Sequence, residues 1–238
     1  LIEWSEPDST WTYIVPTNYD LDMGLGYGAW PSSSLTGTTT VEWQGNLASV
    51  CPTIPLTFND NSGEGHGWNL IGNPYPSAVE WNANWTTTNV DATMYVYDGG
   101  AGNYLTWNYN LNTGTKGNGV IPVAQGFFVK ANAASPDIHI PLTERLHDNE
   151  DFYKSQQSNL LNITVNGKQM NDKAILHFND MATQGFDSDF DAYKIFGDAD
   201  APQLYFPVPQ NDLAVNVLPF SGNNMTIPLN FTAGTNGL

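Results

Sequence analysis

The sequence predicts an all-β protein built from two β-sandwich domains, of jelly-roll or immunoglobulin-like type, with very little helix. Three observations lead to this fold class. The 22 glycines and 15 prolines are spread along all 238 residues, so turn signals recur at short intervals. The runs between them are rich in β-branched and aromatic residues, which favour strands. Helical periodicity of the apolar residues is weak throughout the chain.

Eight short segments carry the strand pattern most clearly, and each ends near Gly, Asn, Asp or Pro. They are residues 11–15, 39–43, 54–58, 93–97, 126–130, 162–165, 174–178 and 213–217. In the segment 126–130 a glycine precedes two phenylalanines. Because side chains alternate along a strand, we expect Phe127 and Phe128 to face opposite sides of a sheet.

Residues 72–76, with the sequence Gly-Asn-Pro-Tyr-Pro, are expected to form a rigid, buried bend. The two prolines restrict the residues before them, Asn73 and Tyr75, to extended backbone. The Asn73 amide can bond to neighbouring backbone groups and so fix the turn. The tryptophans on either side, Trp68 and Trp81, are expected to fill the core of the first domain.

The domain boundary is expected in a polar, charged stretch after the last tryptophan-rich segment. All eight tryptophans lie at or before Trp107, and the later part relies on Leu, Ile, Val and Phe. We therefore expect a Trp- and Gly-rich sandwich over 1–145, a linker over 146–158 and a smaller sandwich over 159–238. The last residues read as a turn that leads into a further strand, so the second domain is expected to be truncated at its C-terminal end.

The charge balance is strongly acidic. Seven Lys and Arg stand against 24 Asp and Glu, the formal net charge is −17, and the first 115 residues contain no Lys or Arg. Such a surface repels phosphates and anionic lipids, so we expect no nucleic-acid partner and no direct membrane insertion. The single cysteine, Cys51, excludes an internal disulfide and is expected to be a buried, inert thiol.

Three motifs resemble a β-sandwich module of large exported proteins of the Bacteroidetes lineage. They are GWNLIGNPYPS at 67–77, IPVAQGFFVKA at 121–131 and GFDSDFDAYK at 185–194. In that family the module stands upstream of the C-terminal sorting domain used by the type IX secretion system. The resemblance implies a secreted protein, extracellular or attached to the outer membrane at the cell surface. It implies no assigned chemistry.

Together these observations favour a non-catalytic structural or interaction module of a secreted or cell-surface protein, adhesin-like or accessory. The sequence contains no nucleophile elbow, phosphate loop or dinucleotide fingerprint. The four histidines are scattered, which disfavours a zinc site, and we expect no enzyme. Expected partners are polysaccharides or other surface proteins, and the sequence does not decide whether the chain assembles with copies of itself.

The alternative function is a carbohydrate-binding module attached to a polysaccharide-degrading or adhesive partner. Sugar-binding sandwiches present flat aromatic rings beside amides and acids. Four rings in loop-rich, asparagine-rich surroundings are the candidates: Tyr75, Trp85, Tyr104 and Trp107. The competing interpretation is that such rings fill the core of a β-domain.

No cofactor is required by these patterns, and calcium is the one ion that they suggest. Asp187, Asp189 and Asp191 place three carboxylates at alternate positions, and calcium prefers several oxygen ligands. The glycine and the glutamate of an EF-hand loop are missing at their positions. The competing interpretation makes Asp187 a turn cap in front of a strand.

Overall fold

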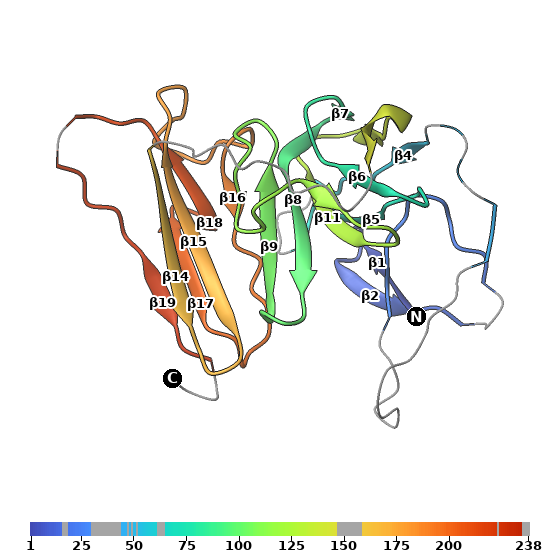
Figure 1. Cartoon of the computed structure of the whole chain (residues 1–238), viewed down its shortest axis with the longest axis horizontal. Coiled ribbons are helices and arrows are strands. Elements are labelled where there is room, and N and C mark those ends of the chain that lie inside the picture. Colours follow the sequence, from blue (N-terminus) through green and yellow to red (C-terminus); the bar gives the residue numbers. More distant parts are fainter. Residues whose placement is uncertain are drawn as a thin grey trace. The chain divides into compact units, whose positions relative to one another are not determined.

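The computed structural model describes residues 1–15, 19–29, 44–46, 48, 50, 52–60, 65–146, 159–222 and 224–234. In this part of the chain the fold is all-β and sandwich-like, with nineteen strands and one 3-10 helix, η1 (Leu142–Glu144) (Figure 1). The predicted fold class is therefore confirmed. The expected strand 39–43, Cys51, residues 147–158 of the expected linker and the last four residues lie outside the described residues.

The chain divides into two compact units, and the first is discontinuous. Unit 1 comprises Leu1–Val90 with Val120–Asn149, and unit 2 comprises Asp91–Gly119 with Glu150–Leu238. The expected domains were contiguous, so the structure differs by assigning residues 91–119 to the second unit. Hydrogen bonds give the reason: the Tyr193 amide donates to the Tyr95 hydroxyl at 3.0 Å, and the Asn103 amide group donates to the Pro202 carbonyl at 3.1 Å.

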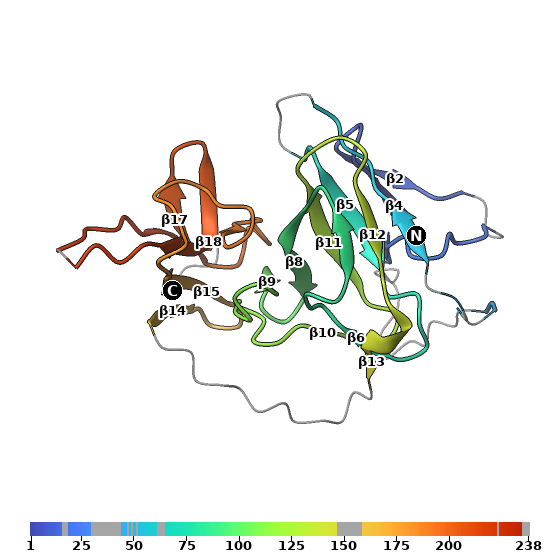
Figure 2. The same cartoon turned by 90° about the horizontal axis from the view of Figure 1, so that it is seen from above.

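Unit 1 is assembled from short antiparallel strands. Its strands are β1 (Ile2–Ser5), β2 (Thr10–Tyr13), β3 (Tyr27–Gly28), β4 (Thr53–Pro55), β5 (Trp68–Gly72), β6 (Ala78–Glu80), β7 (Thr86–Thr88), β10 (Val120–Ile121), β11 (Gly126–Ala131), β12 (Asp137–His139) and β13 (Arg145–Leu146). Three small sheets have the orders β2-β1-β3, β10-β6-β13 and β4-β12-β7. β5 pairs with β11, and Figures 1 and 2 show these two strands side by side.

The pair β5–β11 has one buried face and one partly exposed face. Burial alternates residue by residue along both strands, as the period of a pleated strand requires. Phe127 is buried, whereas Phe128 is only half-buried, so the prediction that the two rings face opposite ways is confirmed. Trp68 lies on the face of Phe128 and is also half-buried, so the prediction that it fills the core is wrong. Trp81 is fully buried, as expected.

The bend at residues 72–76 is tightly hydrogen-bonded, and its Asn73 and Tyr75 side chains are buried, but Pro76 is exposed, so the prediction of a buried bend is confirmed only in part. The Asn73 amide group donates to the carbonyls of Ser77 at 2.8 Å and Pro122 at 3.0 Å. The Asn73 side-chain oxygen accepts from the Tyr75 amide at 3.0 Å. A single buried asparagine therefore satisfies backbone groups of the bend and of the segment after β10.

Unit 2 is built from longer strands. They are β8 (Val90–Asp98), β9 (Asn103–Asn108), β14 (Leu160–Asn166), β15 (Asn171–Phe178), β16 (Ala192–Tyr193), β17 (Gln203–Val208), β18 (Asn211–Leu218) and β19 (Asn230–Thr232). β8 and β9 form an antiparallel hairpin. β18 begins as the partner of β17, ends as the parallel partner of β15, and also pairs with β16. β14 lies beside β15 in both views (Figures 1 and 2).

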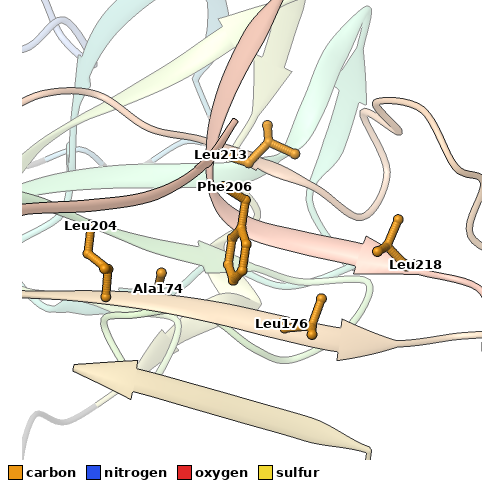
Figure 3. Packing of buried hydrophobic residues seen from close by; sticks show 6 residues of the cluster. All are labelled: Ala174, Leu176, Leu204, Phe206, Leu213 and Leu218. Atoms are coloured by element: carbon orange, nitrogen blue, oxygen red, sulfur yellow. The ribbon is translucent and has the colours of Figure 1, made fainter. Parts of the chain in front are cut away.

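One buried cluster of unit 2 contains a single aromatic ring among aliphatic side chains. Its buried cluster consists of Ala174, Leu176, Leu204, Phe206, Leu213 and Leu218, contributed by β15, β17 and β18. Figure 3 shows the Phe206 ring pointing from its own strand toward β15, between Ala174 and Leu176. β18 pairs with both β15 and β17, and the cluster contains side chains of all three strands.

Candidate functional site

Two of the four rings expected to bind sugar are buried in unit 1. The Tyr75 hydroxyl donates to the Ile140 carbonyl at 2.6 Å, and the Trp85 indole nitrogen donates to the Glu80 carbonyl at 2.7 Å. Tyr75 is 2 % exposed and Trp85 is 5 % exposed. Neither ring presents a face to a ligand, so these two expectations are corrected: both side chains pack the interior and anchor backbone.

The other two rings, Tyr104 and Trp107, lie on β9 in unit 2 and are half-buried. Tyr104 packs edge-on against Tyr97, with ring centroids 5.2 Å apart. The Tyr97 hydroxyl donates to the Asp198 carboxylate at 2.9 Å. Burial and this carboxylate raise the pKa of Tyr97 to about 12. The expectation of sugar binding at Tyr104 and Trp107 stays a prediction.

The three aspartates suggested for calcium are not brought together as a ligand set. The Asp187 carboxylate accepts from the Thr183 amide at 2.6 Å, and the Asp191 carboxylate accepts from the amides of Asp187 at 2.8 Å and Val217 at 2.7 Å. Asp189 contributes its backbone carbonyl to the Asn108 amide group. Among the described residues no group of three His, Cys, Asp or Glu is placed to hold a metal ion. The arrangement fits the turn-cap interpretation, and calcium at these residues stays an untested expectation.

The exposed side of the pair β5–β11 carries an aromatic cluster that the sequence analysis did not single out. Its members are Trp4, Trp11, Trp68 and Phe128, and we call it the aromatic platform. The Phe128 centroid lies 5.9 Å from that of Trp4, 6.1 Å from that of Trp11 and 6.4 Å from that of Trp68, always edge-to-face. The Trp4 indole nitrogen donates to the Trp68 carbonyl at 2.6 Å.

The platform is partly open and carries one cation. Trp11 is 37 % exposed, and every residue of its strand β2 is exposed. The Lys130 ammonium lies 5.0 Å from the ring centroid of Trp68 and donates to the His66 carbonyl at 2.6 Å. A sequence signal was present for part of the platform: Trp11 falls in the predicted strand 11–15, and Phe128 and Lys130 alternate in the predicted strand 126–130.

Beside the platform, unit 1 contains a pocket of about 230 Å³. Its walls come from β1, β4, β5 and the segment at β3. The apolar lining consists of Trp4, Pro7, Leu25, Gly26, Pro55, Leu56, Leu70 and Ile71, and the polar lining of Glu3, Ser5, Glu6, Tyr27, Thr57 and Asn69. Its described lining therefore includes two carboxylates and no Lys, Arg or His.

Glu6 is the unusual residue of this pocket, because an acidic residue is only 2 % exposed there. One carboxylate oxygen, Oε1, accepts from the amides of Gly67 at 2.7 Å and Asn59 at 2.9 Å. The other oxygen, Oε2, is buried without a hydrogen-bond partner. Sequence reasoning missed this residue, since its partners stand more than fifty positions away along the chain.

The chain belongs to the family whose model is described as a domain of unknown function (DUF8693), which matches residues 3–238. Neither the curated proteins nor the solved structures gave a match. In the part of the chain that the structure describes, no helix is long and apolar enough to cross a membrane.

Proposed function

We propose that this member of the DUF8693 family is a non-catalytic interaction module of a secreted or cell-surface protein. The observation that supports the proposal is how its buried polar side chains are used. Asn73 and Asn108 each hold several backbone groups, and Asp191 accepts from two backbone amides. Side chains engaged in this way fix loops in place, as buried polar groups do in structural roles. The asparagine side chains, moreover, carry no titratable proton to exchange with a substrate.

Export to the cell surface rests on the resemblance to modules of type IX-secreted Bacteroidetes proteins, and the strongly acidic composition is compatible with it. The test uses the parent protein in its own host. An antibody raised against the module should detect it in the outer-membrane or culture-medium fraction, and external protease should degrade it on intact cells. Detection in the cytoplasmic fraction alone would contradict this proposal.

The aromatic platform favours a second candidate function, carbohydrate binding. Aromatic rings offer large, rigid apolar faces at little entropic cost. Trp11 is the most exposed of the four rings of the platform, since the other three are half-buried. Because the protein carries a net charge of −17, the expected ligand is a neutral polysaccharide, since uronate-rich chains would be repelled.

Affinity electrophoresis in gels that contain neutral polysaccharides tests the carbohydrate candidate. The wild type should be retarded by at least one of them, and Trp11→Ala should lose the retardation because it removes the open ring. The control is Phe231→Ala, which removes a 45 % exposed ring on β19 of unit 2 and should migrate like the wild type. Tyr104→Ala and Trp107→Ala test the two remaining predicted rings in the same gels. Equal retardation of the wild type and Trp11→Ala would exclude the platform as the binding surface.

A further inference from the structure

The pocket beside the aromatic platform is lined in part by Glu6, whose carboxylate has one buried oxygen that the protein leaves without a hydrogen-bond partner. Glu6 Oε1 is held by the two backbone amides of Asn59 and Gly67, so the carboxylate is fixed in position. Glu6 Oε2 is buried with no partner. A buried acceptor without a donor is unfavourable, and more so when it is charged. A ligand that supplies a donor would relieve this penalty.

Several other polar side chains of the pocket are already engaged. The Ser5 hydroxyl donates to Asp8 at 2.8 Å, and the Tyr27 hydroxyl accepts from the Asp22 amide at 3.0 Å. The Asn69 oxygen accepts from the Thr57 amide at 2.9 Å. Glu6 Oε2 is therefore the buried acceptor of the described lining that has no hydrogen-bond partner, and Glu3 supplies a second carboxylate.

The charge and the walls of the pocket define the chemistry of the ligand. The described lining carries Glu3 and Glu6 and no cationic side chain, so a cationic group is favoured over an anionic one. Trp4 contributes an aromatic ring, and such rings attract ammonium groups. Leu56, Leu70 and other apolar side chains line the rest, which suits an aliphatic stem better than a polyhydroxylated ring.

We propose that this pocket binds a primary ammonium group on an aliphatic stem, with the ammonium donating to Glu6 Oε2 and the stem lying among the leucine side chains. A free alkylamine and a lysine side chain share this chemistry. The volume of about 230 Å³ exceeds that of one water molecule several-fold, so it can accept a short stem. The pocket shares Trp4 with the aromatic platform, whereas Trp11, Trp68 and Phe128 do not line it, so variants of these three residues separate the two sites.

The test is a titration of the full chain followed by amide NMR, with n-butylammonium and Nα-acetyl-lysine methylamide as probes. The amide signals of Asn59 and Gly67 report on the pocket, because both donate to Glu6. We expect saturable shifts of both signals with at least one probe. The neutral analogues n-butanol and Nα-acetyl-norleucine methylamide should bind at least tenfold more weakly. Binding of butylammonium alone points to a free amine, and binding of both probes points to a lysine side chain as an equally suitable source.

Two variants separate loss of the charge from loss of the fold. Glu6→Gln keeps an oxygen for the two amides and removes the negative charge, so the affinity for the ammonium probes should fall at least tenfold with unchanged strand signals. Asp137→Asn removes the same charge from β12, outside the pocket lining, and should bind within twofold of the wild type. Trp11→Ala should likewise keep its ammonium binding, which distinguishes this site from the platform.

Three results would overturn the proposal. The first is the absence of saturable shifts with either ammonium probe. The second is equal binding of the neutral analogues, or tighter binding of glucosamine, glucose or Ca²⁺ than of the alkylammonium probes, at the same two amides. The third is unchanged ammonium binding in Glu6→Gln. If this variant fails to fold, Glu3→Gln provides the second measurement: removing the other carboxylate of the lining should weaken binding at least twofold, and unchanged binding would contradict the proposal.

Discussion

The two units fasten distant parts of the chain by different means. In unit 1 aromatic rings do this on both faces of β11: Phe127 packs against Trp81 and Trp85 inside, and Phe128 joins the platform outside. In unit 2 buried charged side chains take a larger part in this, a role that Glu6 has in unit 1. Lys194 pairs with Asp172 at 2.5 Å, and Asp191 holds two backbone amides. Ring packing depends on volume, whereas buried charges depend on their partners and on pH. The two units should therefore respond to different perturbations.

The largest effect is expected for Trp81→Ala in unit 1. Trp81 is fully buried, and its ring centroid lies 4.8 Å from that of Trp85 and 6.2 Å from that of Phe127. Truncation leaves a cavity, so the free energy of unfolding should fall by about 3–5 kcal/mol. Chemical denaturation followed by fluorescence measures the loss. A loss below about 1 kcal/mol would mean that the ring cluster does not hold unit 1 together.

The corresponding test in unit 2 is Lys194→Met. Burial lowers the pKa of Lys194, and Asp172 acts in the opposite direction. Removing the lysine leaves the Asp172 carboxylate buried without its cation, which should lower the free energy of unfolding by about 3 kcal/mol. Lys173→Met is the matched control, because Lys173 is only half-buried and its ammonium lies 3.5 Å from a carbonyl oxygen. Equal losses in the two variants would show that the ion pair has no special part in unit 2.

The pH dependence of unit 2 should come in part from Asp191. Burial raises the pKa of Asp191 from 3.8 to about 6, with Asp187 adding to the increase. Between these two values the folded state binds a proton that the unfolded state has released. The contribution of Asp191 to the free energy of unfolding is therefore present below about pH 4 and is lost as the pH rises through 6, by at most about 3 kcal/mol.

Titration of the Asp191 carboxyl carbon by NMR measures this pKa directly. The midpoint is expected near 6, and Asp191→Asn should lack the corresponding pH slope in denaturation experiments between pH 4 and 7. A midpoint near 4 would contradict the contrast between the units, because the buried charge would then behave as a surface group.

The smallest effect is expected for Phe128→Ala, on the outer face of β11. Phe128 is half-buried, and its contacts are the edge-to-face pairs of the platform, each of which contributes about 0.5–1.5 kcal/mol in general. We expect a loss of about 2 kcal/mol in the free energy of unfolding, near the lower end for three such pairs. Hydrogen exchange should accelerate mainly in β1 and β2, which the platform attaches to β5. A loss as large as that of Trp81→Ala would place both faces in one core.

The local features of this protein could be predicted from its amino-acid sequence alone. The predicted strands at 93–97, 126–130, 174–178 and 213–217 all lie within observed strands. The opposite orientations of Phe127 and Phe128 and the role of Asn73 in the bend were also predictable. These features depend on residues next to one another, through the alternation of side chains and the backbone restriction imposed by proline. The acidic charge is likewise a property of composition alone.

Which aromatic and acidic side chains are open to a ligand depends on tertiary contacts, and these could not be predicted from the sequence. Tyr75 and Trp85 resemble loop residues in the sequence, yet contacts with distant segments bury them; the Tyr75 hydroxyl bonds a carbonyl 65 residues away. Glu6 looks like an ordinary surface acid until the amides of Asn59 and Gly67 close around it. Residues 91–119 belong to unit 2 for the same reason, through bonds from Tyr95 and Asn103 to much later residues. Burial is the sum of contacts made by segments far apart in the chain, and a local pattern does not contain that information.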